Sequence, residues 1–195
     1  DPDAPDPERF GDPRDGCSAI EDAHGLGFPA NVYPLFENAY RNRLGRSLDA
    51  HMASVGRLFA PFTDVAATNP HAWFPIARSA EELITPSPKN RMVGFPYTKY
   101  LNAIIQVDQA AAVIMTSVAK AEALGVPQDK WVFLHGCSDV TELWDPLDRV
   151  DYASSPAIRF GARAAFEMAG KTPADLAFMD LYSCFPIAVE LACAE

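Results

Sequence analysis

The chain of 195 residues lacks any uncharged apolar stretch close to the roughly 20 residues that a membrane-spanning helix needs. It has no excess of positive charge either, because its formal net charge is −10, and phosphate repulsion would oppose nucleic-acid binding. Its four cysteines, Cys17, Cys137, Cys184 and Cys193, show no CxxC pattern and no Cys/His spacing typical of a metal site. We therefore expect a reduced, cytoplasmic protein with no membrane span and no nucleic-acid partner.

Histidines are few as well, and the four of them are scattered. His135 falls at the end of a predicted strand, where a hydrogen-bonded structural role is the more common one. His24, His51 and His71 have no partner at ligand spacing. The sequence therefore predicts no metal site.

Acidic residues are absent from one long window, residues 83–107. This window contains Lys89, Arg91 and Lys99, and a basic island in an acidic protein favours an anionic ligand. Tyr97 lies among these bases and can stack on a purine ring. The alternative is that the bases pair with acids elsewhere in the fold and that the aromatic ring only packs. These four residues are the candidate ligand-binding residues.

Hydrophobic spacing predicts a mainly helical first portion. The expected helices cover residues 34–44, 47–59 and 62–68, and a capped turn follows at 79–84. Residues 85–100 are rich in Pro, Gly, Asn and aromatic side chains, which indicates an ordered loop.

From residue 110 onward, strands and helices alternate in the predicted order. Residues 110–116, 131–135 and 176–182 have the short apolar runs of buried strands, whereas 117–124, 155–169 and the segment from Pro186 have helical signals. Alternation of this kind implies a layered α/β domain, here a βαβαβα segment.

The last predicted strand ends in Tyr182, Ser183 and Cys184, just before Pro186 opens a helix. Polar side chains at the carboxyl end of a strand, facing a helix N-terminus, are where layered α/β folds bind ligands. A helix N-terminus also stabilises a thiolate, which would make Cys184 more nucleophilic. The alternative is an ordinary turn in which Cys184 packs as a small apolar residue. We take Tyr182, Ser183 and Cys184 as the candidate catalytic residues.

The two ends of the chain predict a piece of a longer protein. The first residues, from Asp1, place several prolines among acids, which is typical of an extended lead-in. The helix that opens at Pro186 reaches residue 195 with no Gly, Asn or basic stop signal.

Three stretches resemble the thiolase superfamily, in particular the actinobacterial thiolase-like acetyl-CoA acetyltransferases and the sterol-carrier-protein type thiolases. The first stretch joins NPHAWFP to TPSPKNRMVGFPYTK, the second is NAIIQVDQAAAVIMTS, and the third is DLYSCFPIAV. The third is similar to the place where thiolases have Asn-Glu-Ala-Phe or, in the sterol-carrier type, His-Asp-Cys-Phe. The resemblance covers the chain from about Gly27 to Glu195.

This resemblance implies a thiolase-like α/β fold of layered αβαβα type, present here as a partial chain. Residues 1–109 would form the end of the first thiolase half, including its helical loop insertion. Residues 110–128 would form the last strand of that half and a connecting helix. Residues 129–195 would form the truncated start of the second half.

The resemblance also implies an acyl-CoA acyltransferase of lipid metabolism, acting in fatty acid or sterol degradation. Coenzyme A or acyl-CoA would be a substrate held by the insertion, with no covalently bound cofactor. The family's nucleophilic Cys would lie outside these residues, so the fragment alone would be inactive. Tyr182 stands where the family has an oxyanion-side Asn or His, and Ile104 stands where many members have a Ser near the pantetheine arm.

These departures leave two alternatives open. Tyr182 also resembles the thiolase-like aldolases, which cleave carbon–carbon bonds in steroid side-chain acyl-CoA with a small partner subunit. The other alternative is a non-catalytic acyl-CoA-binding relative. The family resemblance further implies a homo-oligomer.

Overall fold

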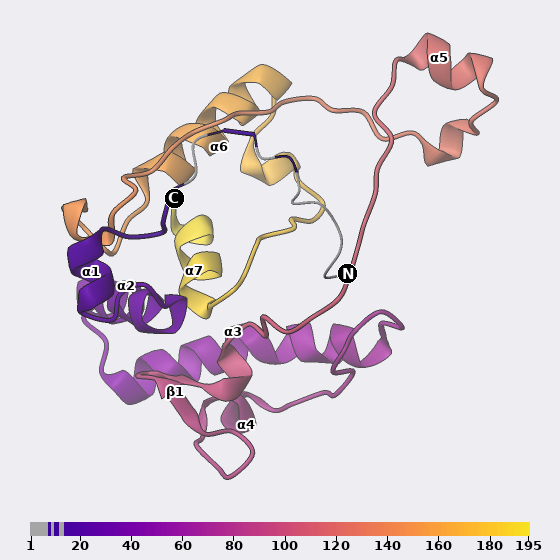
Figure 1. The fold of residues 1–195 in the computed structure, drawn as a ribbon. Coiled ribbons are helices and arrows are strands. Elements are labelled where there is room, and N and C mark those ends of the chain that lie inside the picture. The colour runs from indigo at the N-terminus through magenta and orange to yellow at the C-terminus, as the bar shows by residue number, and fades with distance from the viewer. Residues whose placement is uncertain (1–7, 9, 12–13) are drawn as a thin grey trace.

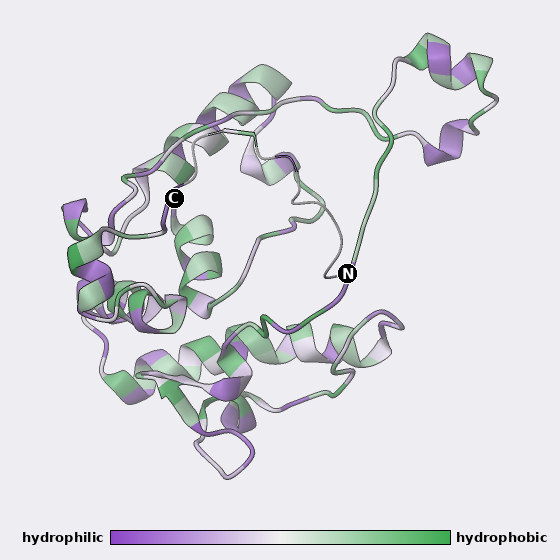
Figure 2. Ribbon diagram, in the orientation of Figure 1, coloured by the Kyte–Doolittle hydropathy of each residue, from purple (hydrophilic) through white to green (hydrophobic). Residues whose placement is uncertain are grey.

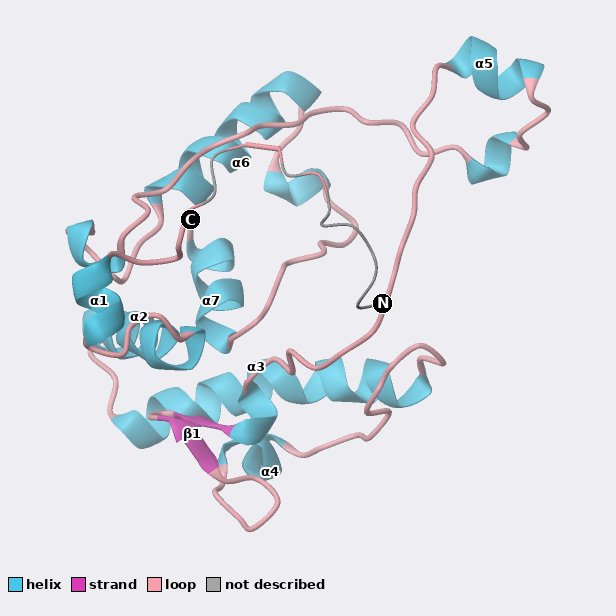
Figure 3. Ribbon diagram, in the orientation of Figure 1, coloured by secondary structure: helices cyan, strands magenta, loops and turns pink. Residues whose placement is uncertain are grey.

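The computed structural model describes residue 8, residues 10–11 and residues 14–195. Helices dominate this part of the chain, and its two short strands form one hairpin (Figure 1, Figure 3). The elements are α1 (Ala19–Ala23), α2 (Pro29–Arg43), α3 (Leu48–Thr68), α4 (Ala80–Ile84), β1 (Met92–Gly94), β2 (Tyr97–Thr98), η1 (Lys99–Leu101), α5 (Val118–Ala123), η2 (Gln128–Lys130), η3 (Pro146–Asp148), α6 (Pro156–Ala169), η4 (Pro173–Asp175) and α7 (Pro186–Ala194), where η denotes a 3-10 helix.

Local sequence signals explain where most helices begin. Ser47 and Ser117 accept hydrogen bonds at the starts of α3 and α5, from the N–H groups of Ala50 at 3.3 Å and Lys120 at 3.2 Å. Proline opens α6 and α7, where its missing N–H would have no partner in any case. The predicted helix from Pro186 is thereby confirmed.

The bounds of α2 and α3 differ from the sequence prediction. α2 begins at Pro29, and Pro34 lies inside it. α3 runs without interruption through Pro61, where we expected one helix to end and another to begin. A proline inside a helix removes one backbone hydrogen bond. Phe59, before Pro61, packs against the core, and the hydroxyl of Thr63, after it, accepts the Arg78 N–H, so tertiary contacts on both sides of the proline stabilise a continuous helix.

The hydrophobic core lies where α2, α3, α4, the hairpin and α7 meet. Although α7 is the last helix of the chain, it packs against α2 near the beginning (Figure 1). This contact brings residues from both ends of the described chain into one core. The buried members are Met52, Val55, Leu83, Tyr97, Leu101, Phe185, Ile187 and Leu191.

The predicted ordered loop 85–100 contains the hairpin. β1 pairs antiparallel with β2, and Gly94 lies opposite Tyr97. Buried Asn90 holds the loop on α4, because its side-chain amide donates to the carbonyl oxygen of Glu82 at 2.9 Å and its Oδ1 accepts from the Tyr100 N–H at 2.9 Å. The loop is therefore ordered by hydrogen bonds within itself and to α4.

Residues 102–185 are more open than the helical portion. α5 and α6 form at their predicted positions, with Gly170 closing α6 at φ 61° in the left-handed region. The predicted strands 110–116, 131–135 and 176–182 do not form hydrogen-bonded strands in this structure.

In the part of the chain that the structure describes, these three segments form no strands because each lacks a neighbouring strand to pair with. A strand is stabilised by hydrogen bonds and side-chain packing to an adjacent strand, and these three segments have none among the described residues. Their apolar side chains are therefore exposed; Val113, Val132 and Phe178 are examples, at 93%, 95% and 89% exposed. Figure 2 shows green, hydrophobic residues along these irregular stretches of the chain. They remain apolar segments without a partner.

No helix in the described part of the chain combines the length and the apolar character that crossing a membrane requires. Even α3, at 21 residues, does not meet both conditions.

Candidate functional site

A hollow of about 690 Å³, which we call the basic hollow, lies beside α3 and the loop that follows α4. Its walls are mostly aromatic and aliphatic, with basic and polar side chains among them. A hollow of this kind suits a ligand that has both an apolar part and an anionic part. Its lining residues are Phe59, Phe62, Thr63, Ala66, Phe74, Ile76, Arg78, Leu83, Pro88, Lys89, Arg91, Lys99, Tyr100, Asn102 and Ile104.

The structure brings Lys89, Arg91 and Lys99 together around the basic hollow, as the acid-free window suggested. All three side chains are exposed. Within the described residues, none of them forms an ion pair with an acidic side chain. The alternative that these bases serve only to pair with acids therefore finds no support in the geometry, and their charges face solvent at the hollow.

Arg78 also lines the basic hollow, but its charge is already paired. Its guanidinium lies 3.7 Å from the centroid of the Tyr100 ring and forms an ion pair with Glu82. Its backbone N–H donates to the hydroxyl of Thr63 in α3 at 2.8 Å. Sequence reasoning missed Arg78 because it precedes the acid-free window, and only the folded loop places it on Tyr100.

Tyr97 does not line the basic hollow, which corrects its expected role against a purine. The side chain is fully buried, and its hydroxyl donates to Glu37 Oε2 at 2.5 Å. Burial and the nearby Glu37 carboxylate raise the pKa of Tyr97 far above its usual range. Its neighbour Thr98 is fully buried as well, whereas Lys99, the first residue of η1, is exposed.

Of the candidate catalytic residues, Tyr182 lines a second hollow of about 490 Å³, which is also lined by residues of α2, α6 and α7, whereas Ser183 and Cys184 do not line it. Tyr182 is 81% exposed and lines this hollow together with Tyr33 and Arg149. Electrostatic interaction with Cys184, and a hydrogen bond to it, raise the pKa of the Tyr182 hydroxyl. The phenol therefore keeps its proton at neutral pH and can act as a hydrogen-bond donor.

The residues after Tyr182 are positioned by Phe185. Its ring is buried and stacks on Tyr33, with centroids 4.5 Å apart and planes 19° apart. Cys184 is half-buried, and its carbonyl oxygen accepts the N–H of Ala103 at 3.0 Å. Ser183 is exposed, and its hydroxyl donates to the carbonyl oxygen of Phe185 at 3.3 Å.

Lys89, Arg91 and Lys99 therefore line the basic hollow and Tyr182 lines the second one, whereas the candidates Tyr97, Ser183 and Cys184 line neither. The connection between the basic hollow and Cys184 is the segment Asn102–Ile104: Asn102 and Ile104 line the basic hollow, and Ala103 between them bonds to Cys184. Ile104 is 41% exposed, in keeping with an apolar wall. A ligand extending along this segment from the basic hollow would approach the turn at Cys184.

Of the comparisons with known proteins, the one with solved structures gives a match. No family model matches the sequence, and no curated protein matches it. Among solved structures, the chain is similar to one described as a monomeric SCP2-thiolase-like protein, type 1, from Mycobacterium smegmatis. The two are 41% identical with a TM-score of 0.85, over 93% of this chain and 40% of that one.

This match decides the fold. Agreement in both sequence and shape over nearly the whole chain shows the thiolase-like α/β fold that the resemblance of the three sequence stretches predicted. The chain spans 40% of the length of the protein it matches, and that protein is described as monomeric, so a homo-oligomer stays a prediction here. The chain belongs to the thiolase superfamily, alongside the SCP2-thiolase-like proteins.

Proposed function

We propose that this chain forms the coenzyme A-binding part of a thiolase-like acyl-CoA acyltransferase. The observation that carries the proposal is the basic hollow, in which Lys89, Arg91 and Lys99 have no acidic partner among the described residues and surround an apolar wall. Acyl-CoA has the matching chemistry: several phosphate charges at one end and a long, largely apolar arm at the other.

Electrostatics supports a local role for these bases. A protein with a net charge of −10 repels an anionic ligand at long range. The ligand is bound only where positive charge outweighs that repulsion, and the acid-free window provides such a place. Three exposed bases can adjust to phosphate oxygens without first breaking ion pairs.

Single substitutions test the proposal. We expect Lys89→Ala, Arg91→Ala and Lys99→Ala in the complete protein each to weaken coenzyme A binding about 10-fold, near the lower end for a charged hydrogen bond, because the sites are exposed. Titration calorimetry with coenzyme A and its 3′-dephosphorylated form measures this. A base that contacts the 3′-phosphate also loses the preference for the phosphorylated form, and one that contacts the diphosphate weakens both.

Lys120→Ala is the matched control, because Lys120 is an exposed lysine in α5 that lines neither hollow. It should leave both affinities at the wild-type value. The proposal would be contradicted if all three hollow variants kept the wild-type affinity for coenzyme A and the wild-type preference for it over the 3′-dephosphorylated form.

The reaction itself is tested in the complete protein by its products. Acyl transfer gives a covalent acyl-enzyme on a cysteine when acyl-CoA is added, which intact-protein mass spectrometry detects. The aldolase alternative gives a free aldehyde without an acyl-enzyme, and the non-catalytic alternative gives binding alone. We expect the acyl-enzyme, with the Tyr182 hydroxyl donating to the thioester oxygen; Tyr182→Phe should then slow acylation about 10²-fold or more. Aldehyde release without acylation would assign the lyase instead.

A further inference from the structure

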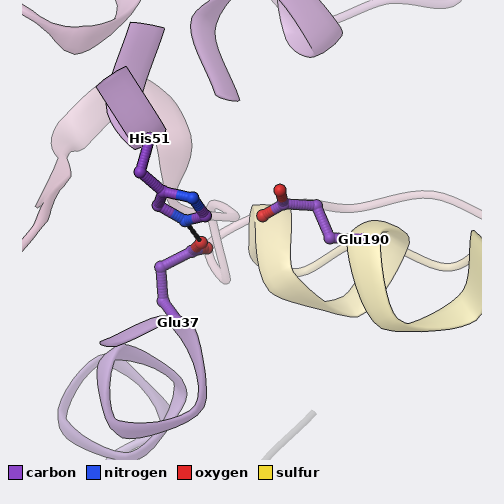
Figure 4. Close-up of side chains that lie close together, drawn as sticks. All are labelled: Glu37, His51 and Glu190. Atoms are coloured by element: carbon purple, nitrogen blue, oxygen red, sulfur yellow. Dashed lines mark hydrogen bonds and ion pairs between the residues drawn. The ribbon is translucent and has the colours of Figure 1, made fainter. Parts of the chain in front are cut away.

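Three side chains from three separate helices meet in the interior. Glu37 of α2, His51 of α3 and Glu190 of α7 point toward one another (Figure 4). One potential ligand atom of each lies within 4.8 Å of those of the other two. Glu37 and His51 are fully buried, and Glu190 is half-buried. The cluster lies outside both hollows described above.

The protein's own hydrogen bonds satisfy only part of this cluster. His51 Nε2 bonds to Glu37 Oε1, and Glu37 Oε2 accepts the Tyr97 hydroxyl at 2.5 Å. His51 Nδ1 and Glu190 Oε2 are buried and have no hydrogen-bond partner in the described residues. A buried polar atom without a partner costs about 1–3 kcal/mol, so two such atoms in one cluster need an explanation.

The charges of the cluster are a second reason to expect a bound ligand there. Two carboxylates in one buried place repel each other, and Arg46 is the positive group that acts on Glu190. A proton shared between the two glutamates relieves the repulsion, but it leaves His51 Nδ1 without a partner. A cation in the middle of the cluster relieves the repulsion and provides a partner for a ring nitrogen.

We propose that Glu37, His51 and Glu190 bind one divalent transition-metal ion of the zinc class. One imidazole nitrogen and two carboxylate oxygens form a donor set that Zn²⁺ accepts, with a fourth position left for water. In a tetrahedral site the ligand atoms lie about 3.4 Å apart, and the atoms offered here lie within 4.8 Å of one another, so side-chain rotation can bring them onto one ion. The Tyr97 hydroxyl orients the Glu37 carboxylate, as groups outside the ligand shell do in metal sites.

The metal would have a structural role, which is separate from the coenzyme A binding proposed above. It would tie α2, α3 and α7 together at the core. α7 begins directly after the turn that carries Tyr182 and Cys184, so the ion would also hold that turn in place.

Cobalt titration of the complete protein tests the site. After dialysis against a chelator, the wild-type protein is expected to bind one equivalent of Co²⁺ with the visible absorption of a four- or five-coordinate ion. Glu190→Gln and His51→Asn should each lower that affinity more than about 100-fold, and Tyr97→Phe about 10-fold, because it removes only an outer hydrogen bond. His71→Asn, at an exposed histidine, is the matched control and should bind as wild type.

Two results would overturn the proposal. One is a wild-type protein that takes up no Co²⁺ and no Zn²⁺ after dialysis. The other is unchanged binding in Glu190→Gln. If His51→Asn does not fold, Glu190→Gln decides alone, because Glu190 is only half-buried and the amide keeps the size of the side chain. Loss of coenzyme A binding is a separate readout, so the two proposals fail independently.

Discussion

Gly94→Ala is expected to lower the free energy of unfolding by about 1–3 kcal/mol, toward the upper end of that range for overpacking. Gly94 is the last residue of β1, and a Cβ atom there would collide with the carbonyl oxygen of Ala30 in α2 and lie 3.2 Å from Pro34 Cγ. A helix carbonyl cannot rotate away as a side chain can. The hairpin would therefore move off α2, which weakens the Tyr97 hydrogen bond to Glu37.

Chemical denaturation of the complete protein measures this effect. Gly16→Ala is the matched control, because a Cβ atom at Gly16 meets nothing within 4 Å. The midpoint of Gly94→Ala should fall clearly below the wild-type midpoint, and that of Gly16→Ala should stay close to it. Equal midpoints for the two variants would mean that α2 and the hairpin do not approach as closely as the structure shows.

Helix positions could be predicted because their signals are local. Ser117 before α5, Gly170 after α6 and Pro186 at the start of α7 each act on backbone groups within a few residues. α3 shows the limit of such signals. Pro61 is a local stop signal, yet the helix continues through it, with Phe59 packed on the core before the proline and Thr63 bonded to Arg78 after it.

The strands could not be settled in the same way. The apolar runs at 110–116, 131–135 and 176–182 have the composition of buried strands. Pairing, however, depends on a second strand that no local pattern specifies, and in the described chain these segments stay extended and exposed. Composition therefore predicted strands. It could not show whether a neighbouring strand is there to pair with them.

The candidate site could be predicted from the sequence only in part, for a similar reason. The gap in acidic residues identified Lys89, Arg91 and Lys99, because charge is a property of the sequence itself. Tyr97 looked equivalent to them, and only the fold shows that it points inward to Glu37. Likewise, Glu37, His51 and Glu190 are far apart along the chain, so no spacing rule brings them together.

Replacing Lys89, Arg91 and Lys99 together with alanine is expected to lower coenzyme A affinity about 10³-fold or more. Each base contributes one charged contact, of about 1.5–3 kcal/mol in favourable cases, and the three line the same hollow. Their loss also removes the local positive charge that offsets the net negative charge of the protein. The effects need not add fully, because neighbouring charges share their influence on one ligand.

Stability should change little in this triple variant. The three side chains are exposed and form no ion pair within the described part of the chain, so few native contacts are lost. Substitutions at exposed positions away from special features usually change the free energy of unfolding by no more than about 0.5 kcal/mol. This separates a ligand-binding role from a structural one.

Calorimetric titration of coenzyme A into three forms of the complete protein is the most direct test of the basic hollow. The forms are the wild type, the triple alanine variant of the hollow, and a control triple variant at the exposed Lys120, Lys130 and Lys171, which changes net charge equally. We predict a loss of about 10³-fold in the hollow variant and a change of less than about 3-fold in the control. Equal losses in the two variants, or none in either, would contradict coenzyme A binding at the basic hollow.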